Sequence, residues 1–129
     1  MGSYHSLEKV NDCDIDFYHN IVQNKIKGKV LRVIDVNKYI IAIKHNFTLK
    51  KIICKAKGFK LKNQNDKLTA IAKFNGLANS ENLIVYLKTY GLNKDGYLLI
   101  DISNNKFDNF KTIMLRENYI EEDDDELLN

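Results

Sequence analysis

Apolar and β-branched residues gather in five short runs separated by polar turns, a pattern that predicts five strands. Two-residue turns at Asn37-Lys38 and His45-Asn46 separate the first three runs, and a turn with glycine at both ends (91–96) separates the last two. The predicted strands are 29–36, 39–44, 47–55, 83–89 and 97–102. The fourth run is apolar almost throughout, which predicts a strand covered on both faces.

Helices are expected at two places. Apolar residues recur at helical spacing over 67–78, with Asp66 as the N-cap. The predicted inward face of this helix is Leu68, Ile71, Ala72 and Leu77 or Ala78. A second, short helix is expected after Asp108, which is its predicted cap. Its predicted inward residues are Phe110, Ile113 and Met114. Residues 56–65 are predicted to form a polar loop, and 14–26 fits either a helix or a strand.

The order strand–strand–strand–helix–strand–strand–helix is the layout of an OB barrel, a five-stranded Greek key. The predicted fold class is therefore mainly β, within the α+β class. Residues 28–120 are expected to form the barrel domain, with 1–27 as an N-terminal extension. The segment 121–129 is expected to be a disordered acidic tail, because a block of like charge opposes ordering.

Charge is strongly segregated along a chain whose net charge is +3. Residues 25–67 carry thirteen basic and two acidic side chains, whereas residues 117–129 carry seven acidic side chains and no basic one. The chain has two cysteines, no apolar run long enough to span a membrane and no signal-peptide pattern at its start. We therefore expect an intracellular protein, cytoplasmic or nuclear and not secreted, with no membrane partner.

Two stretches resemble the staphylococcal-nuclease-like (thermonuclease) family. Residues 29–44, KVLRVIDVNKYIIAIK, are similar to the first hairpin of that family, in which an aspartate-rich turn follows the first strand. Residues 90–118, YGLNKDGYLLIDISNNKFDNFKTIMLREN, are similar to its final strand and the helix after it. The resemblance implies an OB barrel. For active members it implies calcium-assisted phosphodiester hydrolysis, with carboxylate ligands, a glutamate base and two arginines.

The matched positions lack the ligands and the base that this chemistry needs. Asp35 keeps the first aspartate of the turn, but Asn37 stands at the ligand aspartate. Ala56 stands at the second ligand aspartate, Lys57 at the threonine after it, and Phe59 at the general-base glutamate. Calcium prefers several oxygen ligands, and carboxylates are absent from residues 50–65.

The two arginine positions are changed as well. Lys51 keeps the charge of the first arginine without its bidentate fork, and Tyr97 stands at the second. The resemblance therefore predicts a protein that is not an enzyme and needs no metal or other cofactor. A residual calcium-dependent nuclease with relocated ligands, such as Asp35, Asp95 or Asp101, is a minor alternative.

OB barrels bind single strands with a cationic groove and aromatic stacking platforms. The sequence predicts a nucleic-acid-binding face made of six lysines and three aromatic residues. These are Lys50, Lys51, Lys55, Lys57, Lys60 and Lys62, with Tyr39, Phe59 and Tyr97. Two alternatives stay open: a protein–protein or self-association module, and a lysine-rich loop that is merely solvated. The acidic tail is either a solubility tail or a phosphate mimic that folds back on the basic stretch.

Overall fold

A computed structural model describes residues 16–17, 25–45, 48–78, 84–104 and 109–123 of the chain. The strands and helices within these residues alternate in the expected order, with three additional short strands. Their bounds are β1 Asp16–Phe17, β2 Ile26–Asp35, β3 Lys38–His45, β4 Thr48–Ala56, β5 Phe59–Leu61, η3 Gln64–Asp66, α1 Lys67–Ala78, β6 Val85–Leu92, β7 Leu98–Ser103, α2 Phe110–Arg116 and β8 Ile120–Glu122.

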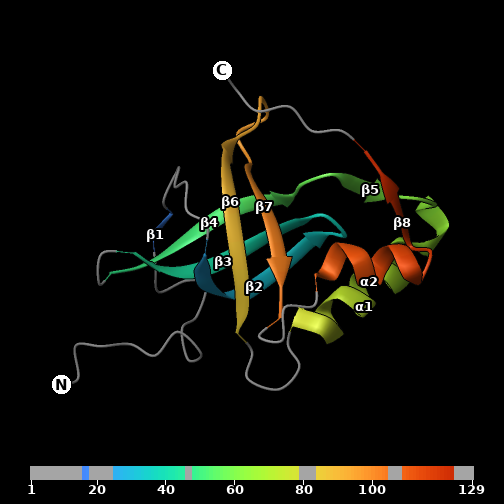
Figure 1. Cartoon of the computed structure of the whole chain (residues 1–129), viewed down its shortest axis with the longest axis horizontal. Helices are drawn as coiled ribbons and strands as arrows, with labels where there is room; N and C mark the ends of the chain where they lie inside the picture. The colour runs from blue at the N-terminus through green and yellow to red at the C-terminus, as the bar shows by residue number, and fades with distance from the viewer. Residues whose placement is uncertain (1–15, 18–24, 46–47, 79–83, 105–108, 124–129) are drawn as a thin grey trace.

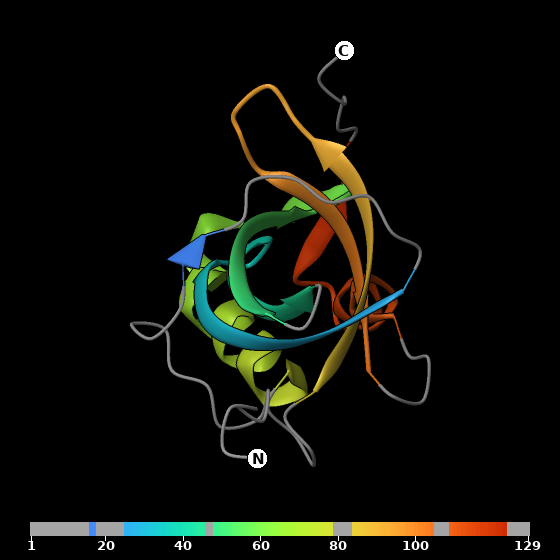
Figure 2. The same ribbon diagram turned by 90° about the vertical axis from the view of Figure 1, so that its left-hand side faces the viewer.

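Five strands close into a mixed barrel of the OB type. Antiparallel ladders join β2 to β3, β3 to β4, β6 to β7 and β2 to β6, and a parallel ladder between β4 and β7 completes the ring. Figure 2 shows the strands wrapped around a closed ring, and Figure 1 shows both helices at one end of it. The predicted fold class is confirmed.

Alternate residues of each barrel strand point into one core. Tyr39 and Ile41 of β3 lie opposite Cys54 and Ile52 of β4, and all four are buried. At the helical end of the barrel, the ring of Phe74 stacks on Tyr39 with the ring centroids 4.2 Å apart. Phe74 also meets Phe110 of α2 edge to face at 5.4 Å, so one aromatic cluster joins the barrel to both helices.

The helix over 67–78 is confirmed, but of its predicted inward residues only Ala78 is fully buried. The buried residues of α1 are Ala70, Phe74 and Ala78, whereas Leu68 is 81% exposed. The small alanines on either side of Phe74 allow α1 to approach the barrel closely along that stripe. Within the described residues, neither α-helix is long and apolar enough to cross a membrane.

Three smaller predictions also need correction. The strand β6 alternates buried and less buried residues, with Lys88 exposed, so it is not covered on both faces. Asn109 caps α2, its side chain accepting a hydrogen bond from the Lys111 backbone N–H, while Asp108 lies outside the described residues. Asp66 ends the short η3 turn, which Asn63 caps.

The predicted loop 56–65 and the predicted disordered tail contain a pair of strands instead. Residues of β5 and β8 form a two-stranded antiparallel sheet in which Lys60 lies opposite Glu121. Ile120 is buried in the core, and the backbone N–H of Asp123 donates to the carbonyl of Gly58 at 3.0 Å. Burial of Ile120 and pairing with a basic strand offset the charge repulsion that favoured disorder at Glu121 and Glu122. Residues 124–129 lie outside the described residues.

Gly28 lies where β2 bridges β3 and β6, and substitution by alanine is expected to destabilise the barrel. A Cβ atom there would lie 2.8 Å from Cγ2 of the buried Ile41 and 3.2 Å from the Ala42 carbonyl oxygen. We expect Gly28→Ala to lower the free energy of unfolding by about 1–3 kcal/mol, as overpacking does. Urea unfolding measures this.

Gly76 of α1 is the matched control, since a Cβ atom there would meet nothing within 4 Å. In the helix interior, Gly76→Ala should raise the free energy of unfolding by roughly 0.5–1 kcal/mol. Equal effects of the two substitutions would show that the contact at Gly28 is not tight.

Candidate nucleic-acid interface

The lysines predicted along β4 do not share one face. Residues two apart on a strand point the same way, so Lys51 and Lys55 face outward, away from the buried Ile52 and Cys54. Lys50 lies on the opposite face of the strand. The Lys51 ammonium nitrogen lies 4.6 Å from the ring centroid of Phe17 in β1, at the far end of β4 from Lys55.

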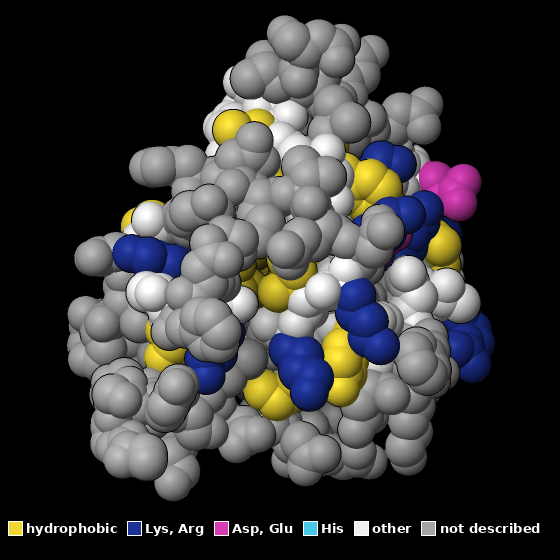
Figure 3. Space-filling view, turned by 60° about the vertical axis from the view of Figure 1, so that its left-hand side comes forward, with side chains coloured by type: hydrophobic (Ala, Val, Ile, Leu, Met, Phe, Trp, Pro, Cys, Tyr) yellow, Lys and Arg dark blue, Asp and Glu magenta, His cyan; other side chains and the backbone are white. Residues whose placement is uncertain are grey.

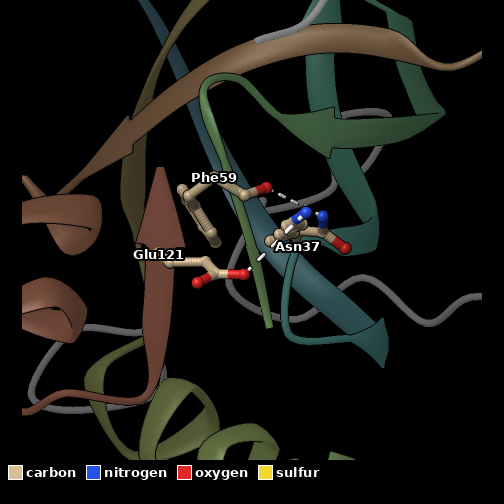
Figure 4. Close-up of polar contacts among 4 residues, drawn as sticks. Asn37, Phe59 and Glu121 are labelled. Carbon is tan, nitrogen blue, oxygen red and sulfur yellow. Dashed lines mark hydrogen bonds and ion pairs between the residues drawn. The ribbon is translucent and has the colours of Figure 1, made fainter. Parts of the chain in front are cut away.

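The lysines of β5 and the residue after it face the acidic end of the chain. The Lys60 Nζ lies 3.8 Å from a carboxylate oxygen of Glu121, and the Lys62 Nζ donates to the side-chain oxygen of Asn118 at 2.7 Å. Close by, Lys111 pairs with Glu122 at 3.9 Å. Figure 4 draws the ion pair of Glu121 as a dashed line. The predicted basic stretch is therefore partly neutralised at this end.

Two of the three predicted aromatic platforms are core residues. Tyr39 is 0% exposed, and its hydroxyl donates to the Val36 carbonyl; Phe59 is 1% exposed. Neither ring has a face that a base can reach, so neither can serve as a stacking platform. Tyr97 is half-buried at the end of the turn between β6 and β7, where part of its surface is accessible.

A basic surface forms instead where β3, β4, β6 and β7 meet. Lys38 lies directly opposite Lys55 in the β3–β4 ladder, and Lys55 lies opposite Leu99 in the β4–β7 ladder. Partners in a ladder point to the same face of the sheet. The Nζ of Lys38 lies 5.2 Å from the ring centroid of Tyr97. The β2–β3 turn, which Lys38 follows, therefore lies close to the turn between β6 and β7, which Tyr97 follows.

Tyr90 of β6 is the centre of this surface. The Nζ atoms of Lys57 and Lys88 lie 4.8 and 5.0 Å from its ring centroid, within cation–π range. Its hydroxyl donates to the carboxylate of Asp101, which lies opposite Lys88 in the β6–β7 ladder. We call this surface the lysine–tyrosine face. It comprises Lys38, Lys55, Lys57, Lys88, Tyr90 and Tyr97.

Sequence reasoning missed Lys38, Lys88 and Tyr90, and it considered Asp101 only as a metal ligand. A signal was present for two of them. Tyr86, Lys88 and Tyr90 alternate with buried residues, and the alternation places all three on the outer face. Lys38 carried no signal beyond its place next to a turn. In Figure 3, dark-blue Lys and Arg side chains lie directly beside yellow side chains, the colour used for hydrophobic residues and tyrosine.

Tyr90 is expected to ionise at unusually high pH. Burial, the hydrogen bond to Asp101 and the charge of that carboxylate raise the pKa of Tyr90 to about 12. Because this folded-state pKa exceeds that of an exposed tyrosine, about 10, the neutral phenol stabilises the fold below pH 10. That contribution is lost as the pH rises toward 12.

The difference in phenolate absorbance between the wild type and Tyr90→Phe isolates this group. We expect the difference curve to have its midpoint near pH 12. Asp101→Asn should lower the midpoint, because it removes the carboxylate's share of the shift and leaves the share due to burial. If the curve for wild type minus Tyr90→Phe had its midpoint at the ordinary tyrosine pKa, it would contradict the Tyr90–Asp101 contact.

The positions that the nuclease resemblance matched to the calcium ligands and the base lie together. The Ala56 N–H donates to the Asn37 carbonyl at 2.8 Å, and the Asn37 amide donates to the Phe59 carbonyl at 3.0 Å. All three residues are buried. Figure 4 shows the Asn37 side chain directed at Phe59. The positions matched to the calcium ligands and the base are therefore occupied by packed, buried side chains and one amide hydrogen bond.

The carboxylates of the minor alternative do not gather. Asp35 accepts from the Val36 N–H at 2.7 Å and pairs with Lys67 of α1 at 3.8 Å. Asp95 lies in the exposed turn before β7, and Asp101 is bound to Tyr90. Among the residues that the structure describes, no group of three or more His, Cys, Asp or Glu is placed to hold a metal ion.

The fold and this surface define the class as an OB-type barrel with a lysine–tyrosine outer face. Comparison with known proteins adds no family, because neither a protein-family model nor a curated protein matches the chain.

Proposed function

We propose that this chain is a non-catalytic, nuclease-like OB module that binds single-stranded nucleic acid through the lysine–tyrosine face. One observation carries the proposal: two tyrosines on the same outer surface each have lysine ammonium groups over their rings. Cations beside aromatic platforms are the combination that sequence-tolerant single-strand binders use.

The position of the face supports this function. OB folds bind oligonucleotides over their second and third strands and the turns after the first and fourth. The equivalent elements here are β3, β4 and the two turns that Lys38 and Tyr97 flank. The lysines would neutralise phosphates, and Tyr90 and Tyr97 would stack unpaired bases, whose faces are accessible only in single strands.

The absence of catalysis is part of the same proposal. Asn37, Ala56 and Phe59 fill the matched nuclease positions with a buried amide and apolar side chains. A water-activating base and a calcium site need accessible carboxylates, which these residues do not provide. The buried free thiol of Cys54 is compatible with the reducing intracellular compartment that we also propose.

Fluorescence anisotropy with a labelled single-stranded oligonucleotide tests the proposal. Four lysines on the face predict a slope of log K against log salt near −2.8, from about −0.7 per phosphate neutralised on single strands. Affinity should thus fall by roughly 50-fold between 50 and 200 mM salt. A duplex of the same length should bind more weakly, because its bases are not available for stacking. Lack of binding at low salt would refute the proposal.

A further inference from the structure

Asp101 places a negative charge on a surface whose other charged side chains are lysines, and phosphate neutralisation alone does not explain it. The outward positions of β4, β6 and β7, all of which the structure describes, carry lysines, tyrosines, apolar residues and a serine, with Asp101 as their one carboxylate. It lies in the middle of β7, opposite Lys88 and two residues after the buried Leu99. A carboxylate there repels a polyanion, so generic phosphate binding gains nothing from it.

The carboxylate has acceptor capacity left for a ligand. The Tyr90 hydroxyl is the hydrogen-bond donor that the structure places on Asp101, and it uses one oxygen. An ionised carboxylate offers about four acceptor positions over its two oxygens. Asp101 is also partly exposed, so solvent and ligands can reach this residue. Carboxylates read nucleobases by accepting from exocyclic amino groups, as in contacts to the N4 amine of cytosine.

The contact with Tyr90 sets the geometry for such reading. Because the phenol hydroxyl bonds to Asp101, the carboxylate lies at the edge of the ring and not over its face. A base stacked on the ring would therefore bring its own edge beside the carboxylate. Lys57 and Lys88, now about 5 Å from the ring centroid, are long and flexible and can leave the ring for the phosphates on either side.

We infer that Tyr90 and Asp101 form a base-reading pair, in which Tyr90 stacks an unpaired base and Asp101 accepts a hydrogen bond from its exocyclic amino group. The inference rests on the proposed function and specifies its ligand. Cytosine has an amino group where thymine has a carbonyl oxygen, which Asp101 would repel. The site thus prefers cytosine-containing single strands to thymine-containing ones.

Labelled oligo-dC and oligo-dT of equal length, compared by anisotropy at low salt, test this inference. The wild type should bind oligo-dC about tenfold more tightly, the effect of one hydrogen bond to a charged group. Asp101→Asn should bring the ratio close to one, because an amide both donates and accepts. Tyr90→Phe keeps the stacking ring but removes the hydroxyl that positions the carboxylate, so it should still bind both strands and show a smaller preference for oligo-dC. Tyr90→Leu should weaken binding of both strands.

Asp95→Asn is the matched control, since it removes one negative charge from the exposed turn between β6 and β7. It should strengthen binding of both strands equally and leave their ratio unchanged. Equal wild-type affinities, with Asp101→Asn strengthening both strands alike, would overturn the base-reading role and leave the proposed function standing. Failure of both strands to bind the wild type at low salt would overturn both. Thermal unfolding of each variant confirms that it is folded.

Discussion

Replacing Asn37 with aspartate is expected to destabilise the fold by roughly 3–5 kcal/mol at neutral pH, the effect of an uncompensated buried charge. The substitution restores the ligand that the nuclease resemblance assigns to this position. In this structure, however, the side chain is buried and donates from its amide to the Phe59 carbonyl at 3.0 Å. A carboxylate at this position has no N–H to donate, so its oxygen would face the Phe59 carbonyl oxygen with no hydrogen bond between them.

The loss should depend on pH in a defined direction. Burial and the facing carbonyl favour the protonated acid, so the pKa of the new carboxyl would be higher in the folded state than in the unfolded state. The variant should therefore be closest to wild type in acid and lose stability as the pH rises toward 7. Urea unfolding at several pH values measures this.

Asn118→Asp is the matched control for Asn37→Asp. Asn118 is exposed, and its side-chain oxygen already accepts from Lys62 at 2.7 Å, so the change should stay within about 0.5 kcal/mol. An Asn37→Asp variant as stable as wild type at pH 7, with a melting temperature that calcium raises, would contradict the packed site described above.

Phe74→Ala is expected to lower the free energy of unfolding by about 3–5 kcal/mol, the usual effect of truncating a buried phenylalanine. Its ring lies between Tyr39 and Phe110, with centroid distances of 4.2 and 5.4 Å. Its loss would leave a cavity where the barrel end meets both helices. A native stability of 5–15 kcal/mol is typical, so much of it would be lost. Chemical denaturation measures the change.

Leu68→Ala is the control on the same helix. The sequence pattern placed Leu68 on the inward face, but it is 81% exposed, so its truncation should change stability by less than about 0.5 kcal/mol. A larger loss at Leu68 than at Phe74 would mean that α1 is rotated relative to the structure described.

The barrel was predictable because strand order and turn spacing are local signals. Each apolar run gave a strand, and the OB layout followed from their order around α1. The rotation of α1 was not predictable, because it depends on how Ala70 and Ala78 fit against the barrel. The β5–β8 pair was missed for a similar reason. Its ladder joins Phe59 to Glu122 across the whole second half of the chain.

The candidate site shows the same limit more sharply. Charge density along the sequence marked the region from Lys50 to Lys62, but the fold divides those lysines. Strand alternation sends Lys50 and Lys51 to opposite faces, and the β8 ladder sets Lys60 against Glu121. Lys38 and Lys88 come to the same surface from other strands, through ladders that only the closed barrel defines. The aromatic rings nearest in sequence, Tyr39 and Phe59, fill the core.

The salt dependence of single-strand binding in two matched double variants tests the central claim most directly. Lys55→Gln with Lys57→Gln removes two charges from the lysine–tyrosine face. Lys60→Gln with Lys62→Gln removes two from β5 and the residue after it. We predict that the first pair reduces the slope of log K against log salt from about −2.8 to about −1.4, and that the second pair leaves it unchanged. Equal reductions in both pairs, or a larger reduction in the second, would contradict the assignment of binding to the lysine–tyrosine face.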